Sequence, residues 1–393
     1  MTAWKFWPEQ GFWNPCRAGL PQHLAQHELV TAAWEGLDAA RVWDSHAHLV
    51  GTGDSRSGIT INPEMDSVLN PANYARRLFF LNAGCANNDA GGGVDRAYVQ
   101  RLLNLMDGMR SGSKILLFAF ERVYGEDGKP RDAQTSFHVP DAYARDTARA
   151  HPRHFEWVAS IHPYRADCVA ALEAAKRDGA RAVKWLPGAM GMDPASPRCD
   201  RFYETAAQLG LPVISHAGLE RAVLGTDTQD FGNPLRLRRA LDAGVRVVVA
   251  HCASMGQDRD LDQGPNGPLV DSFALFSRLF EIEKYGKHLF GDISAMTQIN
   301  RAGPALAKVI EREEWHSRLL NGSDYPLPGV MPIFSVDYLV SLGLAQATAA
   351  PVLKEIRGHN PLLFDFVLKR HLRSKGKALA KTVFETRTFF DAA

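Results

Sequence analysis

The chain has 393 residues, of which 45% are hydrophobic and 23% are charged, and this is the composition of an ordinary globular protein that is long enough to bury a large core. Its 45 Lys and Arg residues balance 44 Asp and Glu residues, so no overall basic field exists to attract nucleic acid or an anionic membrane. No apolar run reaches the roughly 18 residues of a membrane span, and the start of the chain lacks the pattern of a secretory signal, so we expect a cytoplasmic protein.

The first 40 residues are predicted to form an N-terminal extension that packs Trp4, Trp7 and Trp13. Five cysteines are scattered along the whole chain, and none belongs to a C-x-x-C pair. This spacing is typical of a protein from a reducing compartment and argues against a metal site built from cysteine.

A pattern of strand, loop and helix recurs along the rest of the chain. The strands are expected at 41–49, 114–121, 155–162, 180–186, 211–216, 245–251, 288–293 and 317–324. Helices are expected at 167–177, 200–209, 235–243 and 304–314, and Gly179, Gly210 and Gly244 stand where left-handed caps end three of them. Eight apolar strands that alternate with helices predict an α/β fold, a (β/α)₈ TIM barrel, over residues 41–393.

One interval between strands is much longer than the others. Residues 50–112 separate the first two strands and contain two helical stretches, at 73–81 and 94–109. Because insertions after a barrel strand lie on the catalytic face, we expect this one to roof the pocket and to shape substrate choice. The alternative is a surface elaboration or a contact between copies of the chain in a homo-oligomer. From Tyr338 onward, helices are expected to close the barrel, with Asn360 capping a helix at 362–373.

Histidines and one aspartate stand at the ends of the predicted strands. His46 and His48 end the first strand, His216 the fifth, His251 the sixth and Asp324 the eighth. The carboxyl ends of barrel strands carry the active site, and burying polar groups there without a partner costs several kcal/mol. One or two metal ions would satisfy all five side chains. Imidazole and carboxylate ligands suit Zn, Mn, Fe or Ni better than Ca or Mg.

Lys184 ends the fourth strand. One interpretation is a lysine whose stem packs in the barrel while its ammonium group reaches water. The other is a lysine that CO₂ carboxylates, so that it becomes an anionic ligand shared by two metals.

The order of these six residues resembles the amidohydrolase superfamily of metal-dependent barrel enzymes. The segments GARAVKWLPGAMGMDPASPRCDRFYETAAQLGLPVISHAG and RLLNGSDYP look like its amidohydrolase-related (amidohydrolase 2) branch, and GHNPLLFDFVLKR is similar to the closing helix of that branch. The resemblance covers about residues 40–372. The branch also contains decarboxylases and hydratases.

The resemblance implies roles for the six residues. His46, His48, His216 and Asp324 would hold a primary divalent metal, most readily Zn. In members with two metals, the carboxylated lysine of strand four and the histidine of strand six bind the second ion, which carries over to Lys184 and His251. In members with one metal, the histidine of strand six is catalytic instead. The sequence contains the residues for both arrangements, so one or two ions per chain are expected.

These roles predict a metal-dependent hydrolase that cleaves an amide, ester or lactone bond of a small molecule. A bound divalent ion lowers the pKa of its water to about 7, and Asp324 would accept the proton of that water as general base. The metal or His251 would stabilise the developing negative charge. One alternative is a decarboxylase or hydratase of a small carboxylic acid on the same scaffold. The other is a barrel without catalytic activity that binds a ligand or a partner.

Further residues near the strand ends are weaker candidates. Those expected to contact substrate are His162, Arg165, Trp185 and Tyr325. Those expected to support the site or to lie at the surface are Asp44, Glu220, Arg221 and Asp292. Asp44 would orient His46 from outside the ligand set or else be solvated. Glu220 and Arg221, four and five residues after His216, could reach substrate, but we expect them at the surface. Asp292 is expected to support the barrel mouth rather than to bind metal.

Overall fold

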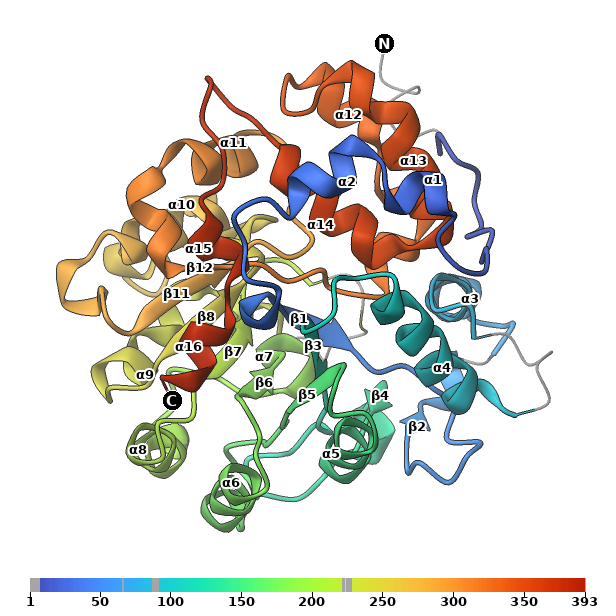
Figure 1. The fold of residues 1–393 in the computed structure, drawn as a ribbon. Coiled ribbons are helices and arrows are strands. Elements are labelled where there is room, and N and C mark those ends of the chain that lie inside the picture. Colours follow the sequence, from blue (N-terminus) through green and yellow to red (C-terminus); the bar gives the residue numbers. More distant parts are fainter. Residues whose placement is uncertain (1–7, 66, 87–91, 221–222, 224–227, 393) are drawn as a thin grey trace.

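The computed structural model describes residues 8–65, 67–86, 92–220, 223 and 228–392. Eight parallel strands form its centre (Figure 1). They are β1 (Trp43–His48), β3 (Lys114–Phe118), β5 (Phe155–Val158), β6 (Val183–Trp185), β7 (Val213–His216), β8 (Val247–Ala250), β11 (Leu289–Asp292) and β12 (Leu319–Leu320). Each lies within one of the eight strands predicted from the sequence.

Backbone hydrogen bonds close these strands into a barrel. The strands pair in two groups, β1-β3-β5 and β12-β11-β8-β7-β6. Between β5 and β6, the amide of Lys184 donates to the carbonyl of Ala159 at 2.7 Å. Between the end of β12 and β1, the amide of Asp324 donates to the carbonyl of His46 at 2.8 Å. The protein is therefore a (β/α)₈ barrel, as predicted.

Helices cover the outside of the barrel (Figure 1). Those that follow the strands are α5 (Asp141–Ala150), α6 (Cys168–Arg177), α8 (Asp200–Gln208), α9 (Arg238–Asp242), α10 (Ser272–Phe280) and α11 (Pro304–Glu311), with the short α7 (Pro187–Met190) after β6. The tail forms α12 (Val336–Ser341), α13 (Ala350–His359), α14 (Pro361–His371), α15 (Lys381–Phe384) and α16 (Arg387–Asp391).

The predicted helix caps are confirmed. Gly179, Gly210 and Gly244 have φ values of +89°, +63° and +82°, in the left-handed region that glycine adopts without strain. The side chain of Asn360 accepts a hydrogen bond from the amide of Leu363 at 3.0 Å and so begins α14.

A buried apolar cluster fills the interior of the barrel below the site. Its members include Leu116, Phe118, Val158, Ala182, Ile214 and Val248 from the strands and Phe389 and Phe390 from α16. The C-terminal helix therefore closes the end at which the strands begin. Lys184 and His216 follow Ala182 and Ile214 by two residues, and the twofold period of a strand turns them toward the same interior.

The insertion after β1 forms a small sheet and two helices. Strand β2 (Thr60–Ile61) pairs antiparallel with β4 (Phe137–His138), and α3 (Pro71–Ala83) and α4 (Val94–Asp107) follow β2. The two helices were predicted, whereas this sheet and a second antiparallel pair, β9 (Gln257–Arg259) with β10 (Leu269–Asp271), were not. Strands of two or three residues are too short to show an alternating pattern.

The N-terminal extension lies against the insertion. After α1 (Gln22–Ala25) and α2 (Glu28–Ala33) the chain enters the barrel. Earlier in the extension, Trp13 stacks on Phe79 of α3 with ring centroids 5.2 Å apart, although it stays 53% exposed. Trp4 and Trp7 lie outside the described residues.

Cys16 and Cys85 form a disulfide between the extension and the end of α3. The cysteine spacing did not predict this bond, because the two residues are 69 positions apart. The bond removes the cysteine argument for a reducing compartment. Among the described residues, no helix is long and apolar enough to cross a membrane.

Candidate metal centre

A first group of candidate ligands joins the end of β1 to the end of β12. His46 and His48 lie on one face of β1, with ring centroids 5.3 Å apart. Oδ1 of Asp324 lies 3.3 Å from Nε2 of His46 and 3.1 Å from Nε2 of His48. The three ligand atoms all lie within 4.8 Å of one another, so the three side chains can converge on one ion.

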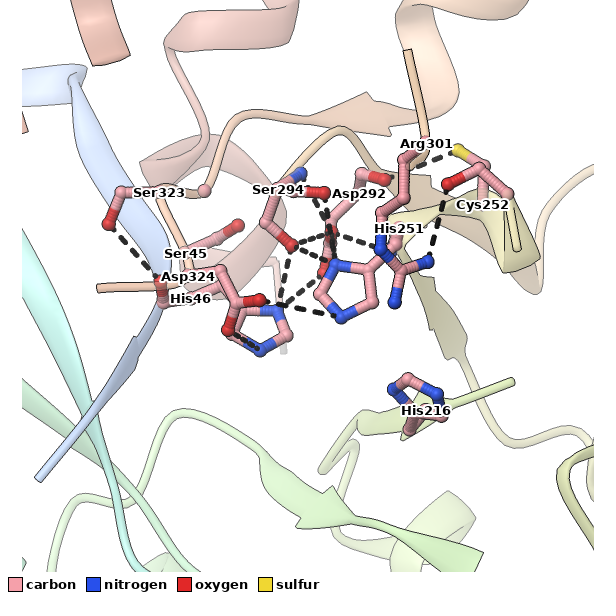
Figure 2. Close-up of polar contacts among 12 residues, drawn as sticks. Ser45, His46, His216, His251, Cys252, Asp292, Ser294, Arg301, Ser323 and Asp324 are labelled. Atoms are coloured by element: carbon pink, nitrogen blue, oxygen red, sulfur yellow. Dashed lines mark hydrogen bonds and ion pairs between the residues drawn. The ribbon is translucent and has the colours of Figure 1, made fainter. Parts of the chain in front are cut away.

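His46 also belongs to a second group, with His251 and Asp292 (Figure 2). Nδ1 of His46 lies 2.9 Å from Oδ2 of Asp292. The other oxygen of this carboxylate accepts the amides of His251 at 2.9 Å and Ser294 at 3.0 Å. Asp292 was expected only to support the barrel mouth, but it also offers a candidate ligand atom. The missed signal is that Asp292 ends β11, as His48 ends β1 and His216 ends β7.

His216 faces the same centre from β7, and its two nitrogens differ in their surroundings. Nδ1 lies 3.4 Å from Oε2 of Glu220. Nε2 is buried and has no hydrogen-bond partner within the described part of the chain. A buried nitrogen without a partner costs free energy, and an imidazole lone pair is a good ligand for a divalent transition metal. The residues present therefore fit a metal ion.

Two of the candidate residues have an unusual backbone conformation. His251 and Asp324 have φ values of +55° and +61°, in the left-handed region that costs a residue with a side chain roughly 1–2 kcal/mol. Each is held there by its own amide, that of His251 bonded to Asp292 and that of Asp324 to the carbonyl of His46. Strain that is maintained in this way is common at functional sites.

Burial keeps the histidines of the centre neutral. It lowers the pKa of His46, lowers the pKa of His251 well below its ordinary value, and lowers the pKa of His216 to about 4. Burial alone would raise the pKa of Asp324, but its interactions with His251 and His46 outweigh burial and lower it well below the ordinary value. At neutral pH the site thus presents imidazole lone pairs and a carboxylate, which are the protonation states that a metal needs.

Lys184 is fully buried beside the first group. Its Nζ lies 3.3 Å from Nε2 of His46 and 5.3 Å from the ring centroid of Phe118. Burial lowers the pKa of Lys184 to about 8. A larger fraction of the amine is therefore uncharged near neutral pH than in an exposed lysine, and only the uncharged amine reacts with CO₂.

The six predicted residues all line one cavity, which is open to solvent. Its walls are mostly apolar and come from loops and from the insertion. The wall residues include Val50, Ile61, Met65, Phe80, Leu81, Phe120, Phe137, Leu186, Pro326 and Leu327. Arg77, Phe80 and Leu81 belong to α3, so the insertion does border the pocket.

Four residues predicted to contact substrate do not lie among the residues that line this cavity. Nε2 of His162 lies 3.0 Å from the carbonyl of Met190, and Arg165 forms ion pairs with Glu121 and Asp167. Trp185 donates to the carbonyl of Ile161 at 2.8 Å and is fully buried, as is Tyr325, whose ring packs 5.8 Å from that of Tyr98. These contacts hold the four side chains in the packing and the loops around the barrel, and their role toward a substrate stays a prediction.

The structure also shows where the residues predicted to support the site, or to lie at the surface, are placed. Glu220, expected at the surface, lines the cavity and contacts His216. Asp44 accepts the amides of His46 at 3.1 Å and Ser323 at 2.8 Å, so it fixes the backbone of the candidate ligands rather than a ring. Arg221 lies outside the described residues.

Comparison with known proteins connects this geometry to a family. A family model described as amidohydrolase matches residues 43–362. No curated protein matches the chain.

Solved structures with a similar arrangement include an uncharacterized TIM-barrel protein, Bb4693, from Bordetella bronchiseptica (16% identity, 77% of this chain and 91% of that chain, TM-score 0.48). Another is a probable 2-pyrone-4,6-dicarboxylic acid hydrolase from Acinetobacter baumannii (15% identity, 80% and 92%, TM-score 0.41). A third is a 5-carboxyvanillate decarboxylase from Novosphingobium aromaticivorans in complex with manganese (11% identity, 89% and 96%, TM-score 0.46).

Proposed function

Because the chain belongs to the amidohydrolase family, we propose that it is a metal-dependent hydrolase that cleaves an amide, ester or lactone bond of a small molecule. The observation that carries the proposal is the buried Nε2 of His216, which has no partner among the described residues, at the floor of a cavity that His46, His48 and Asp324 also line. These four residues would hold the primary ion. Zinc is our first choice, because imidazole and carboxylate are its usual ligands at catalytic sites.

Lys184 and His251 extend the site. With Lys184 carboxylated, they would hold a second ion. When bound, a divalent ion supplies a nucleophile at neutral pH by lowering the pKa of its water to about 7. Asp324 would accept the proton of that water and pass it to the leaving group, since its carboxylate is ionised and faces the cavity.

In the arrangement with one ion, His251 would instead be the catalytic residue at the substrate oxygen. Its Nδ1 lies 3.0 Å from the carbonyl and 2.8 Å from the hydroxyl of Ser294. With the hydrogen of Nδ1 donated to that carbonyl, Nε2, 3.7 Å from Asp324, is a lone pair that would have to take up a proton before it donates to the substrate oxygen. The apolar walls would exclude water and bind the body of the substrate. A small molecule is thus the expected partner, rather than nucleic acid or a membrane. The cytoplasmic location stays a prediction, and the Cys16–Cys85 disulfide argues against it.

The second candidate function is a metal-dependent decarboxylase or hydratase of a small carboxylic acid. The observation in its favour is Lys184: as the ammonium ion it places a positive charge at the floor of an apolar cavity, where a carboxylate would be attracted. The same lysine would be an anion in the site with two metals. The state of Lys184 therefore separates the two functions.

The first experiment is to measure metal per chain by plasma mass spectrometry on protein purified without chelator, with and without added bicarbonate. About two ions per chain with bicarbonate support the hydrolase, and ester, lactone and amide substrates are then screened. One ion under both conditions shifts support to the lyase, and carboxylic acids are then assayed for release of CO₂ and for hydration. A chain that holds no metal, and binds none of added zinc or manganese, overturns both and leaves a barrel that binds a ligand or partner without catalysis.

A further inference from the structure

The three buried imidazoles of the centre share one arrangement: each has an oxygen near its Nδ1. For His46 this is Oδ2 of Asp292 at 2.9 Å, and for His251 it is the carbonyl of Ser294 at 3.0 Å. For His216 it is Oε2 of Glu220 at 3.4 Å. A partner at one ring nitrogen fixes the tautomer and leaves the other nitrogen to bind a metal.

Glu220 differs from the other two partners in its position. Asp292 and Ser294 are fully buried, whereas the side chain of Glu220 is 12% exposed and lines the cavity. Among the described residues that line the cavity, Glu220 and Asp324 are the two carboxylates. A carboxylate in this place needs partners, because burying an unpaired charge costs free energy.

The local structure holds the carboxylate of Glu220 in place. Oε1 accepts the amide of Val223 at 3.1 Å, and the amide of Glu220 donates to the side chain of Gln229 at 3.3 Å. The side chain of Gln229 in turn donates to the carbonyl of Gly218 at 3.0 Å. Glu220, four residues after His216, is therefore held through its amide by Gln229 and through its carboxylate by the amide of Val223.

A buried arginine completes the surroundings. Arg301 is 8% exposed and follows β11; its Nη1 donates to the hydroxyl of Ser254 at 3.4 Å (Figure 2). Burial lowers the pKa of Arg301, and the carboxylate of Glu220 is the largest influence that opposes this shift. Arg301 thus supplies a positive charge that acts on Glu220 and also on Asp324 and Asp292.

We propose that Glu220 is the positioning residue for His216: its carboxylate accepts the hydrogen of Nδ1 and thereby keeps Nε2 unprotonated, as the nitrogen that binds metal. The inference rests on the proposed metal centre, because only a metal gives that nitrogen a use. It assigns a role to a residue that sequence analysis expected at the surface. Glu220 is not a catalytic residue in this scheme, since it acts through His216.

The test uses the full chain selectively labelled with ¹⁵N-histidine, first free of metal and then with Zn²⁺ as the only probe. Long-range ¹H–¹⁵N spectra report which ring nitrogen of His216 carries the hydrogen, and a His216→Gln spectrum assigns the signal. Zn²⁺ affinity is measured by competition with a chromophoric chelator. The variants are Glu220→Ala and Glu220→Gln, whose amide oxygen can accept the same hydrogen. Glu204→Ala, at an exposed glutamate of α8, is the control.

In the wild-type chain we expect the hydrogen of His216 on Nδ1. Glu220→Ala should give a mixture of tautomers and weaken Zn²⁺ binding about 10–100-fold, Glu220→Gln should restore most of both, and the control should change neither. An unchanged tautomer and affinity in Glu220→Ala, or a wild-type hydrogen on Nε2, overturns the inference. If the wild-type chain binds no Zn²⁺ while Glu220→Ala still shifts the tautomer, the proposed function fails and the hydrogen bond from His216 to Glu220 stands.

Discussion

Replacing Asp292 by asparagine changes one atom of the carboxylate and should remove metal from the site without unfolding the protein. The side-chain oxygen of asparagine can still accept the amides of His251 and Ser294. The other oxygen, 2.9 Å from Nδ1 of His46, becomes an NH₂ group that can only donate. His46 must then accept at Nδ1 and carry its hydrogen on Nε2, the nitrogen that faces Asp324.

The size of the effect follows from these contacts. One hydrogen bond to a charged group is lost or reversed, which costs about 1.5–3 kcal/mol, and the bonds that survive become neutral and weaker by about half. We therefore expect the free energy of unfolding of the metal-free protein to fall by about 2–4 kcal/mol. Metal affinity should fall at least 10–100-fold, the usual loss when a partner of a ligating histidine is removed.

The assay pairs denaturation in urea, followed by circular dichroism, with chelator competition for Zn²⁺. Asp200→Asn is the matched control, because Asp200 pairs with Arg239 on the surface of α8, away from the cavity. A variant that folds and binds Zn²⁺ as tightly as the wild-type chain would show that Asp292 does not set the hydrogen position of His46, and the reasoning from tautomers would fail for this residue.

Three further predictions concern catalysis, pH and the disulfide. Asp324→Asn should lower turnover about 100-fold or more while circular dichroism stays unchanged; turnover near that of the wild-type chain would exclude Asp324 as the base. Burial raises the pKa of Asp141 to about 7, so the folded protein keeps a proton that the unfolded chain releases above about pH 4, and stability falls as pH rises from there to neutral. The free energy of unfolding of Asp141→Asn, relative to that of the wild-type chain, should therefore rise by up to about 4 kcal/mol between pH 4 and pH 7. Urea denaturation at each pH measures this difference, and a difference that does not change with pH contradicts the pKa given to Asp141. The double variant Cys16→Ser, Cys85→Ser opens a loop of 69 residues and should lose about 4 kcal/mol of stability; equal urea midpoints for the variant and the oxidised wild-type chain would contradict this.

The barrel could be predicted from sequence because its signals are local and repeated. Each strand is a short apolar run, and glycines such as Gly179 and Gly244 mark helix ends by their position alone. The six residues at the centre share one further property, a place near the carboxyl end of a strand or in the turn that follows it, so the topology of a parallel barrel brings them together. Family resemblance then supplied their roles.

What sequence could not supply depends on contacts between distant segments. Trp185 and Tyr325 each follow a candidate ligand directly, yet both are packed into the core. Trp185 is the neighbour of Lys184 in β6, so it points to the opposite face of that strand. Glu220 looked like a surface residue, since only the path of the loop after β7 turns it back to His216. The bond between Cys16 and Cys85 needed the extension and the end of α3 to meet.

The wall that α3 gives to the cavity is built independently of the strands that carry the candidate ligands. The extension holds this helix through the Cys16–Cys85 bond and through Asn14, whose amide donates to the side chain of Asn82 at 2.7 Å. A chain that begins after Cys16 would keep every candidate metal ligand, but α3 would lose the contacts that hold it against the cavity. We therefore expect loss of the extension to change substrate choice more than metal binding. The insertion itself also reaches the metal centre, because the hydroxyl of Tyr98 in α4 donates to the carbonyl of His48 at 2.6 Å.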